Sequence, residues 1–304
     1  MALDTKTIPP ALIESYLEGK CGFFVGAGVS RGAGLPDWKG LLLKMIDHAV
    51  GARLGDKAKL AECRKLADDP NKYLMLAEEM KEVLGGVEFK TIIEEVFINH
   101  AHNPTRVHEL LVQLEHKKLI LTTNYDMLIE NAFVNNRIRP LVYKYYEAHA
   151  IQRSLFKREF FVLKAHGDAE TSPEQIILTE RDYRRILYRE PGYQSALQSI
   201  FTMYSIVLIG SSLVDPELRL LLNYINAAFP EGGVPHYALM SDTNMSQTEA
   251  GRLLKDYNMR IIPISPKHNY KDIETFLEFL LTKEKNKPKT KATAVKKKSV
   301  AGGK

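Results

Sequence analysis

Asn124 and His166 are the two side chains of this sequence best suited to bond cleavage. A histidine titrates near neutral pH, so it can accept or release the one proton that such reactions move. A neutral amide has two donors and an acceptor, which suits it to holding a water molecule or a hydroxyl group. Each residue follows a short apolar run, Leu119–Leu121 before Asn124 and Phe160–Leu163 before His166. Structural roles are the alternative, because asparagine is a common helix cap and buried histidines are often hydrogen-bonded core residues.

A glycine-rich turn follows the first apolar run of the chain. The run Cys21–Val25 predicts a buried strand, and Gly26-Ala27-Gly28 comes directly after it. In doubly wound folds such a turn brings backbone N–H groups close to a pyrophosphate. The common dinucleotide fingerprint needs a third glycine at position 31, where this chain has Arg31. The glycine pattern alone is therefore also compatible with a structural turn.

The elements that carry these residues predict an α/β fold. Ser205–Ile209 is another apolar run, and it ends at Gly210-Ser211-Ser212, whose serines could bind ribose or phosphate oxygens or simply form a turn. Two more strands are expected at Tyr237–Met240 and Arg260–Ile264. Each motif follows the carboxyl end of an apolar strand, where open parallel sheets bind their ligands. We expect a Rossmann-like, doubly wound parallel sheet with a ligand at that edge.

A helical insert is expected around residues 39–117, because this stretch is far longer than an ordinary connection. It leaves the sheet at the glycine-rich turn and could cover the site. The apolar spacing predicts helices at Thr5–Lys20, Tyr73–Leu84, Phe89–Ile98, Val107–Leu114, Leu218–Ala228, Gln247–Tyr257 and Lys271–Leu281. The expected organisation is one domain over residues 1–283 and a disordered basic tail over residues 284–304, which is rich in lysine and has no apolar periodicity.

Four motifs in this order resemble those of the sirtuin (Sir2) superfamily. The segment Gly26 to Trp38 is similar to the sirtuin cofactor loop, and Thr122-Thr123-Asn124-Tyr125-Asp126 is similar to its Thr-x-Asn-x-Asp motif. His166-Gly167 resembles the catalytic His-Gly pair, and Gly210-Ser211-Ser212 resembles the late nucleotide loop. The resemblance implies an NAD-consuming domain that covers most of the chain.

The resemblance also assigns roles to individual residues. Asn124 and His166 would be catalytic, and Asp126 would touch the nicotinamide amide. Asn124 and Asp126 could equally cap a helix near Met127. Trp38, the only tryptophan, could form a wall for the nicotinamide or anchor the following helix. The implied cofactor-binding set is Gly26, Ala27, Gly28, Ser30, Arg31, Pro36, Asp37, Trp38, Thr123, Asp126, Gly210, Ser211 and Ser212.

Two departures from the deacylating sirtuins point to a different activity. The chain has no cysteine after Cys63, so the sirtuin zinc module is missing and no zinc is expected. Thr179-Glu180-x-Asp182-Tyr183 is similar to the bacterial Sir2-like group of antiphage systems, which hydrolyses NAD and so depletes the cell. The resemblance thus implies an NAD glycohydrolase that releases nicotinamide and ADP-ribose. An NAD-dependent protein deacylase and a non-catalytic nucleotide-binding sensor are the alternatives.

Charge and composition limit the kinds of partner that the chain is expected to have. The formal net charge is +5, but residues 283–304 hold nine lysines and one glutamate, so the rest of the chain is mildly acidic. The basic tail could bind nucleic acid through phosphates, although a solvated tail is the commoner outcome. No membrane span or leader is expected, and two cysteines favour a reducing cytoplasm. A toxic NADase must be silent at rest, so we expect a homo-oligomer, a separate activating partner of the helicase-ATPase or Argonaute type, or both.

Overall fold

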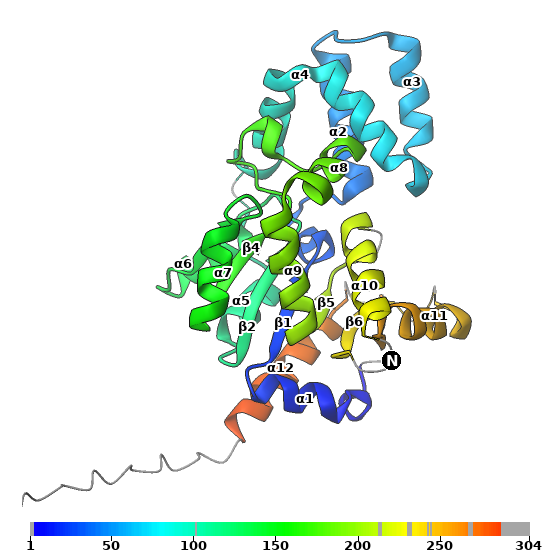
Figure 1. Ribbon diagram of the computed structural model, residues 1–304. Coiled ribbons are helices and arrows are strands. Elements are labelled where there is room, and N and C mark those ends of the chain that lie inside the picture. Colours follow the sequence, from blue (N-terminus) through cyan, green and yellow to red (C-terminus); the bar gives the residue numbers. More distant parts are fainter. Residues whose placement is uncertain are drawn as a thin grey trace, which may run out of the picture.

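A seven-stranded parallel sheet forms the centre of the molecule, with the strand order β3-β4-β2-β1-β5-β6-β7 (Figure 1). The computed structural model describes residues 3–286 apart from 101, 212–214, 230–232, 242, 244 and 267–269. The strands are β1 (Cys21–Val25), β2 (Lys117–Thr122), β3 (Leu141–Lys144), β4 (Phe161–Lys164), β5 (Ser205–Ile209), β6 (His236–Ser241) and β7 (Met259–Ile264). This order, with β1 inside the sheet and the chain moving first to one side of it and then to the other, confirms the predicted doubly wound fold.

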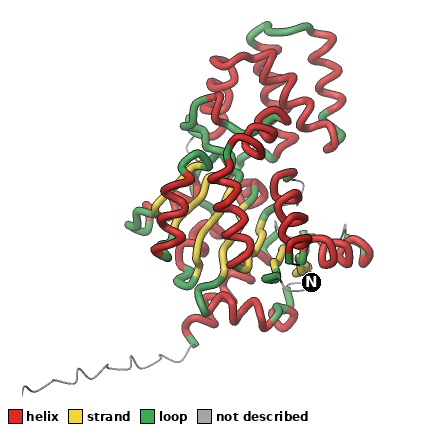
Figure 2. The backbone as a smooth tube through the Cα atoms, in the orientation of Figure 1, coloured by secondary structure: helices red, strands yellow, loops and turns green. Residues whose placement is uncertain are grey.

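Helices cover both faces of the sheet, as Figure 2 shows. One face packs against α1 (Pro10–Leu17), α5 (Arg106–Gln113), α6 (Leu128–Asn135) and α12 (Asp272–Lys285). The other face packs against α7 (Ala148–Lys157), α8 (Glu180–Arg189), α9 (Pro191–Met203), α10 (Pro216–Ala228) and α11 (Gln247–Tyr257).

The side chains of the inner strands alternate between the two covered faces of the sheet, which explains why these strands are apolar throughout. In β1, Phe23 and Val25 join the core on the α5 side, whereas Phe24 between them joins the core on the α9 side. In β5, Val207 and Leu208 divide in the same way. Successive side chains of a strand point to opposite faces, so a strand covered on both faces needs apolar residues at every position.

A third hydrophobic cluster holds a separate helical layer together. It is built on α2 (Trp38–Gly51), α3 (Lys57–Leu66) and α4 (Tyr73–Phe97), which stand above the carboxyl edge of the sheet in Figure 1. Helix α4 is interrupted at Gly85, whose φ of 63° and ψ of 178° are not helical. The two predicted helices Tyr73–Leu84 and Phe89–Ile98 are therefore the two arms of α4.

The residues that the sequence assigns to an insert divide between two bodies. Helices α2–α4 form the separate layer, whereas α5 packs on the sheet. At the other end, α12 continues to Lys285, so residues 284 and 285 are helical although the sequence places them in the tail. Residues 287–304 lie outside the described part. Among the described residues, no helix is both long and apolar enough to cross a bilayer.

Two types of element escape the sequence patterns. Edge strand β3 is exposed or half-buried along its whole length, so it lacks the continuous apolar run that marks the inner strands. Helices α7, α8 and α9 are not predicted, although α7 has a clear apolar face that buries Ile151.

Candidate functional site

The sheet brings the four sequence motifs to one edge. Strands β4, β2, β1 and β5 are neighbours, and Thr122 at the end of β2 is paired with Val25 of β1 and Lys164 of β4. Val25 is in turn paired with Ile209 of β5. The loops that follow these strands carry Gly26, Asn124, His166 and Gly210, so all four motifs start at the same level of the sheet.

Close contact between two loops explains the glycines. The backbone N–H of Gly28 donates to the carbonyl oxygen of Gly210 at 2.9 Å, and that of Gly26 donates to Ile209 at 3.0 Å. A Cβ at Gly26 would lie 2.6 Å from the Gly210 oxygen, and one at Gly28 would lie 2.8 Å from it. Gly210 itself has a φ of +62°. Each glycine therefore has a packing reason to be glycine, whether or not a phosphate lies nearby.

The predicted cofactor loop is largely a 3₁₀-helix, Ala27–Ala33, which Gly34 ends in the left-handed conformation. Ser30 is buried in it and Arg31 is exposed. Pro36 is half-buried just before α2, whose N-cap is Asp37; the Asp37 carboxylate accepts the backbone N–H of Gly40 at 2.9 Å.

Trp38, the first residue of α2, packs on the helical layer. Its ring lies 5.6 Å from that of Tyr73, at the start of α4. This is the helix-anchoring arrangement that the sequence left open beside a nicotinamide wall. A cofactor-binding role for Trp38 and Asp37 stays a prediction.

Asn124, Ser30 and Asp126 form a buried hydrogen-bonded group between the loops after β1 and β2. The Asn124 amide nitrogen donates to the Ser30 hydroxyl at 3.2 Å and to the Gly26 carbonyl at 3.3 Å. The Ser30 hydroxyl donates to Asp126 Oδ2 at 2.8 Å. Asn124 Oδ1 is buried and has no hydrogen-bond partner, which costs free energy unless a ligand or water satisfies it. The amide is thus held by its donors, and its acceptor is left unused.

Asp126 has a capping function as well. Its Oδ1 accepts the backbone N–H of Leu128 at 3.0 Å, at the start of α6. The neighbouring motif residue Thr123 is half-buried, whereas the hydroxyl of Thr122 bonds across to the Val25 carbonyl at 2.7 Å. Both oxygens of Asp126 therefore have protein partners, and the predicted contact with a nicotinamide amide would need their remaining lone pairs.

His166 faces acidic groups at the start of α10, on the α8 side of the sheet edge. Its Nε2 lies 3.4 Å from Asp215 Oδ2 and 3.9 Å from Glu217 Oε2, and it makes no hydrogen bond. The Tyr183 ring meets the imidazole edge to face at 5.3 Å. Burial lowers the pKa of His166 below its usual value, although Asp215 acts in the opposite direction. The imidazole is therefore neutral at pH 7.

The two predicted catalytic residues are brought to neighbouring strand ends, and both are buried. Asn124 is 5% exposed and His166 is 4% exposed. Their partners differ, because Asn124 bonds to the loop after β1 whereas His166 faces α8 and α10. Of the late loop, Ser211 is half-buried and Ser212 lies outside the described residues.

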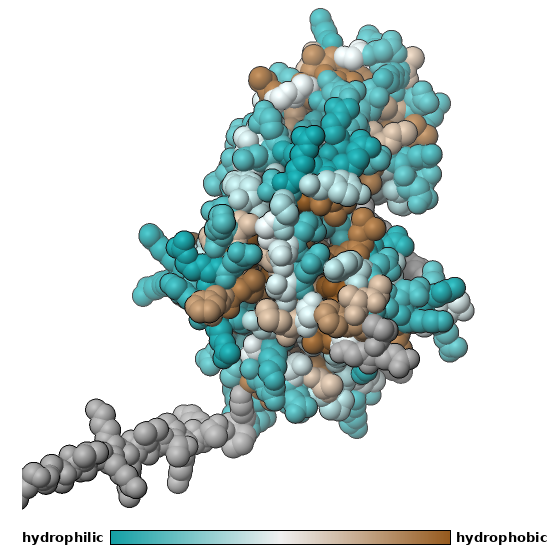
Figure 3. Space-filling model, in the orientation of Figure 1, coloured by the Kyte–Doolittle hydropathy of each residue, from teal (hydrophilic) through white to brown (hydrophobic). Residues whose placement is uncertain are grey.

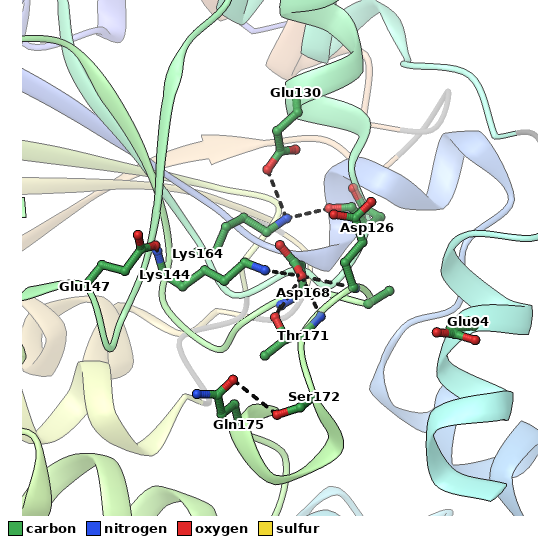
Figure 4. A network of polar contacts seen from close by, with 12 residues as sticks. Glu94, Asp126, Glu130, Lys144, Glu147, Lys164, Asp168, Thr171, Ser172 and Gln175 are labelled. Carbon is green, nitrogen blue, oxygen red and sulfur yellow. Dashed lines mark hydrogen bonds and ion pairs between the residues drawn. The ribbon is translucent and has the colours of Figure 1, made fainter. Parts of the chain in front are cut away.

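A buried charge network supports the loop of His166 (Figure 4). The fully buried Lys164 ammonium donates to the Asp126 carbonyl at 2.5 Å and lies 3.3 Å from Glu130. Asp168, two residues after His166, accepts bonds from the Thr171 hydroxyl at 2.8 Å and pairs with Lys144 at 3.0 Å. Burial alone would raise the pKa of Asp168, but Lys164 and Lys144 hold it below its usual value.

The helical layer is fastened over this edge by two lysines of α4. Lys90 donates to the carbonyl oxygens of Ala169 at 2.5 Å and Thr171 at 2.9 Å. Lys81 pairs with Asp182 of α8 at 2.8 Å. The Lys90 contacts join the helical layer to the segment directly after His166-Gly167.

Sequence reasoning missed several residues of this site. Asp215 caps α10 by accepting the Leu218 N–H at 2.9 Å, a common role for an aspartate, but it also faces His166. Tyr183 was noted only for its resemblance, and Glu217 and Lys164 gave no signal. A carboxylate that starts a helix looks the same in sequence whether or not a histidine lies opposite it.

Fold and site together define a doubly wound, Rossmann-like α/β domain with a buried amide and a buried histidine at the carboxyl edge of its sheet. Residues 118–262 match the family model of the SIR2-like domain. The match includes Asn124, His166, Tyr183 and Asp215, while the glycine loop after β1 precedes it.

Named relatives include bacterial defence proteins. The chain is 25% identical over 291 residues to defense-associated sirtuin 2 of Bacillus subtilis, a match that covers 92% of this chain and 27% of the relative. It is 25% identical over 247 residues to the NAD(+) hydrolase ThsA of Cytobacillus dafuensis, a match that covers 81% of this chain and 46% of the relative. It is 27% identical over 241 residues to the NAD(+) hydrolase ThsA of Acinetobacter baumannii (strain 532279), covering 79% and 46%. The chain thus spans less than half the length of these relatives.

Among solved structures, a Sir2 homolog–NAD complex aligns with a TM-score of 0.45 and 14% identity, covering 90% of this chain and 94% of that one. An ADP ribose complex of a Sir2 homologue aligns with a TM-score of 0.47 and 14% identity, covering 92% and 100%.

Proposed function

We propose that this protein is an NAD+ glycohydrolase that cleaves the nicotinamide–ribose bond, and that it depletes NAD in antiphage defence. The observation that carries the proposal is the Asn124 amide, held by two donated hydrogen bonds with its buried acceptor unused, on a strand end next to that of His166. The relatives named NAD(+) hydrolase and defense-associated sirtuin support the same reaction and setting.

The chemistry assigns one task to each residue. Nicotinamide leaves with the bonding electron pair, so positive charge develops on the ribose carbon and a weak nucleophile suffices. Asn124 Oδ1 accepts a hydrogen bond from the attacking water, because its own amide nitrogen is already committed to Gly26 and Ser30. The neutral His166 imidazole takes the proton that the water releases. The products are nicotinamide and ADP-ribose.

Burial of both residues makes this state of the molecule a closed one. A dinucleotide needs access to Asn124 and His166, which are almost fully covered here. Lys90 and Lys81 of the helical layer bind the segment that follows His166, so the layer is placed to control access to the site. An NADase that is silent until triggered would suit this arrangement, with opening of the layer as the activating step.

The experiment that tests the function is nicotinamide release from NAD+ by the purified protein. Wild type is compared with His166→Ala and Asn124→Ala, each with and without an acetyl-lysine peptide. We expect release that needs no peptide and is lost in both variants. Release only with peptide would replace the proposal with a deacylase. Tight NAD+ binding with no release by wild type, even when a trigger is supplied, would indicate a sensor.

The control of this activity is part of the proposal. Self-association or a separate activating protein of the helicase-ATPase or Argonaute type would open the site. Leu220 and Tyr224 of α10, one helical turn apart, are each more than half exposed, and Figure 3 shows apolar surface gathered beside this helix. That surface supports self-association. We further propose a cytoplasmic setting, a single NAD-binding domain with a helical insert, and nucleic-acid contact through the lysines after residue 286.

A further inference from the structure

Asp215 is held by three elements at once. Its Oδ1 accepts the backbone N–H of Leu218 at 2.9 Å and so caps α10. Its Oδ2 accepts the Tyr183 hydroxyl of α8 at 2.8 Å. The same Oδ2 is the carboxylate oxygen nearest to His166, 3.4 Å from Nε2. The first two bonds fix the orientation of the carboxylate. The remaining lone pair of Oδ2 therefore has a defined direction, and its neighbour is His166.

His166 Nε2 has no better partner in the described part of the chain. It is buried and makes no hydrogen bond, and 3.4 Å is slightly beyond the usual range for N–H···O. Catalytic hydrogen bonds are often long in a ligand-free state and shorten when substrate binds. A movement of about 0.5 Å would bring the pair to an ordinary hydrogen-bond length.

The charges around the imidazole identify Asp215 as the partner. The groups that face His166 are Asp215 and Glu217 from α10 and Asp182 and Tyr183 from α8. Burial and the nearby Asp215 raise the pKa of Glu217 to about 8, so Glu217 is mostly neutral at pH 7. Asp182 is committed to Lys81 and to its own helix cap. Asp215, whose Oδ2 lies nearest to Nε2, is therefore the carboxylate left to face the ring.

We propose that Asp215 is a positioning residue that keeps the proton of the neutral His166 imidazole on Nε2, with Tyr183 fixing the carboxylate. Nδ1 then carries the free lone pair that accepts the proton of the attacking water. The imidazolium formed has one proton on each nitrogen, and Asp215 stabilises it until the Nδ1 proton passes to solvent. The arrangement follows the general logic of a base oriented by a third group. The catalytic step rests on the proposed NADase function, whereas the tautomer does not.

The tautomer can be measured directly. Protein labelled with ¹⁵N-histidine is studied at pH 7 by long-range ¹H–¹⁵N correlation, and the His166 signals are identified by their loss in His166→Gln. Wild type should show the proton on Nε2. Asp215→Asn keeps an N-cap for α10 but removes the negative charge. In this variant the proton of His166 should lose its preference for Nε2, and the pKa of His166 should be lower than in wild type. A wild-type proton on Nδ1, or an Asp215→Asn signal identical to wild type, would overturn the proposal.

Activity supplies the second readout. Asp215→Asn should lower kcat at least about tenfold with a smaller change in KM, and the acid limb of kcat/KM should move to lower pH. Tyr183→Phe should shift the same limb by less. Asp56→Asn, at the exposed N-cap of α3, is the matched control and should behave as wild type. Unchanged kcat and pH profile in Asp215→Asn would contradict the positioning role. A wild type that releases no nicotinamide even when a trigger is supplied would instead refute the NADase function, and the NMR result would still decide the tautomer.

Discussion

The carbonyl oxygen of Gly210 accepts the backbone N–H of Gly28 at 2.9 Å, and this bond joins the loop after β5 to the loop after β1. The two strands are neighbours in the sheet, so their loops meet where a doubly wound fold changes direction. The contact leaves no room for side chains and fixes the entrance of the loop that carries Ser30.

A methyl group at Gly26 should therefore disturb both loops. Gly26→Ala would place Cβ 2.6 Å from the Gly210 oxygen, and we expect a loss of roughly 1–3 kcal/mol in the free energy of unfolding. Gly51→Ala is the control, because nothing lies within 4 Å of its Cβ and alanine is a better helix former. Urea denaturation measures both. Equal stability of the two variants would show that the loops can separate without cost.

Asn124→Ala separates catalysis from folding. It removes two hydrogen bonds, worth about 1 kcal/mol each, and the acceptor assigned to water. Nicotinamide release should fall by about 100-fold or more, whereas Tm should fall by only a few degrees. Asn136→Ala, which removes a bond to the Ala132 carbonyl at the end of α6, should leave release unchanged. A variant that folds like wild type and keeps its activity would remove Asn124 from the mechanism.

Replacing Glu217 with a residue that cannot ionise should make the folded protein more stable. Its pKa is raised to about 8 by burial and by Asp215, well above the value of about 4.3 in an unfolded chain. The folded state therefore binds the proton more tightly, and stability falls as pH rises from about 4 to 8. Glu217→Gln should raise stability at pH 8 by about 1–3 kcal/mol and flatten this slope. Denaturation at several pH values tests it, and an unchanged slope would mean that Glu217 is ionised at neutral pH.

Asp168 should give the opposite pH dependence. Its pKa lies below the usual value because Lys164 and Lys144 overcome the effect of burial. Its contribution to stability is complete above the unfolded pKa of about 3.9 and is lost as pH falls through the lower folded value. Asp168→Asn should be less stable than wild type at pH 7, and the difference should shrink towards pH 3. A difference that does not depend on pH would indicate a purely steric effect.

Lys90→Met tests whether the helical layer closes the site. It removes the bonds to the carbonyl oxygens of Ala169 and Thr171, so hydrogen exchange in residues 167–178 should become faster. Basal nicotinamide release should rise if opening is the activating step. Lys59→Met is the control, since Lys59 pairs with Glu79 inside the layer. Faster exchange without more release would exclude the layer as the barrier.

The sequence predicts the inner sheet well because its strands are buried on both faces. Cys21–Val25 and Ser205–Ile209 are strands with the expected bounds, and each is an unbroken apolar run. The edge strand Leu141–Lys144 was missed because half-exposed residues carry no such run. Gly85 lies between two predicted helices, which the structure joins across a kink at this residue.

The sequence by itself determined the type of fold and the order of its motifs, and it predicts the pair Asn124 and His166, because strand patterns and loop residues are local. Tertiary structure alone decided what these residues face. Ser30 reaches Asp126 across 96 positions, and His166 meets Asp215 and Tyr183 from helices that follow later in the chain. Such contacts depend on which loops the sheet order brings together and on burial, which sets the pKa values of His166 and Glu217. The spacing of the residues along the sequence predicts neither these contacts nor the burial.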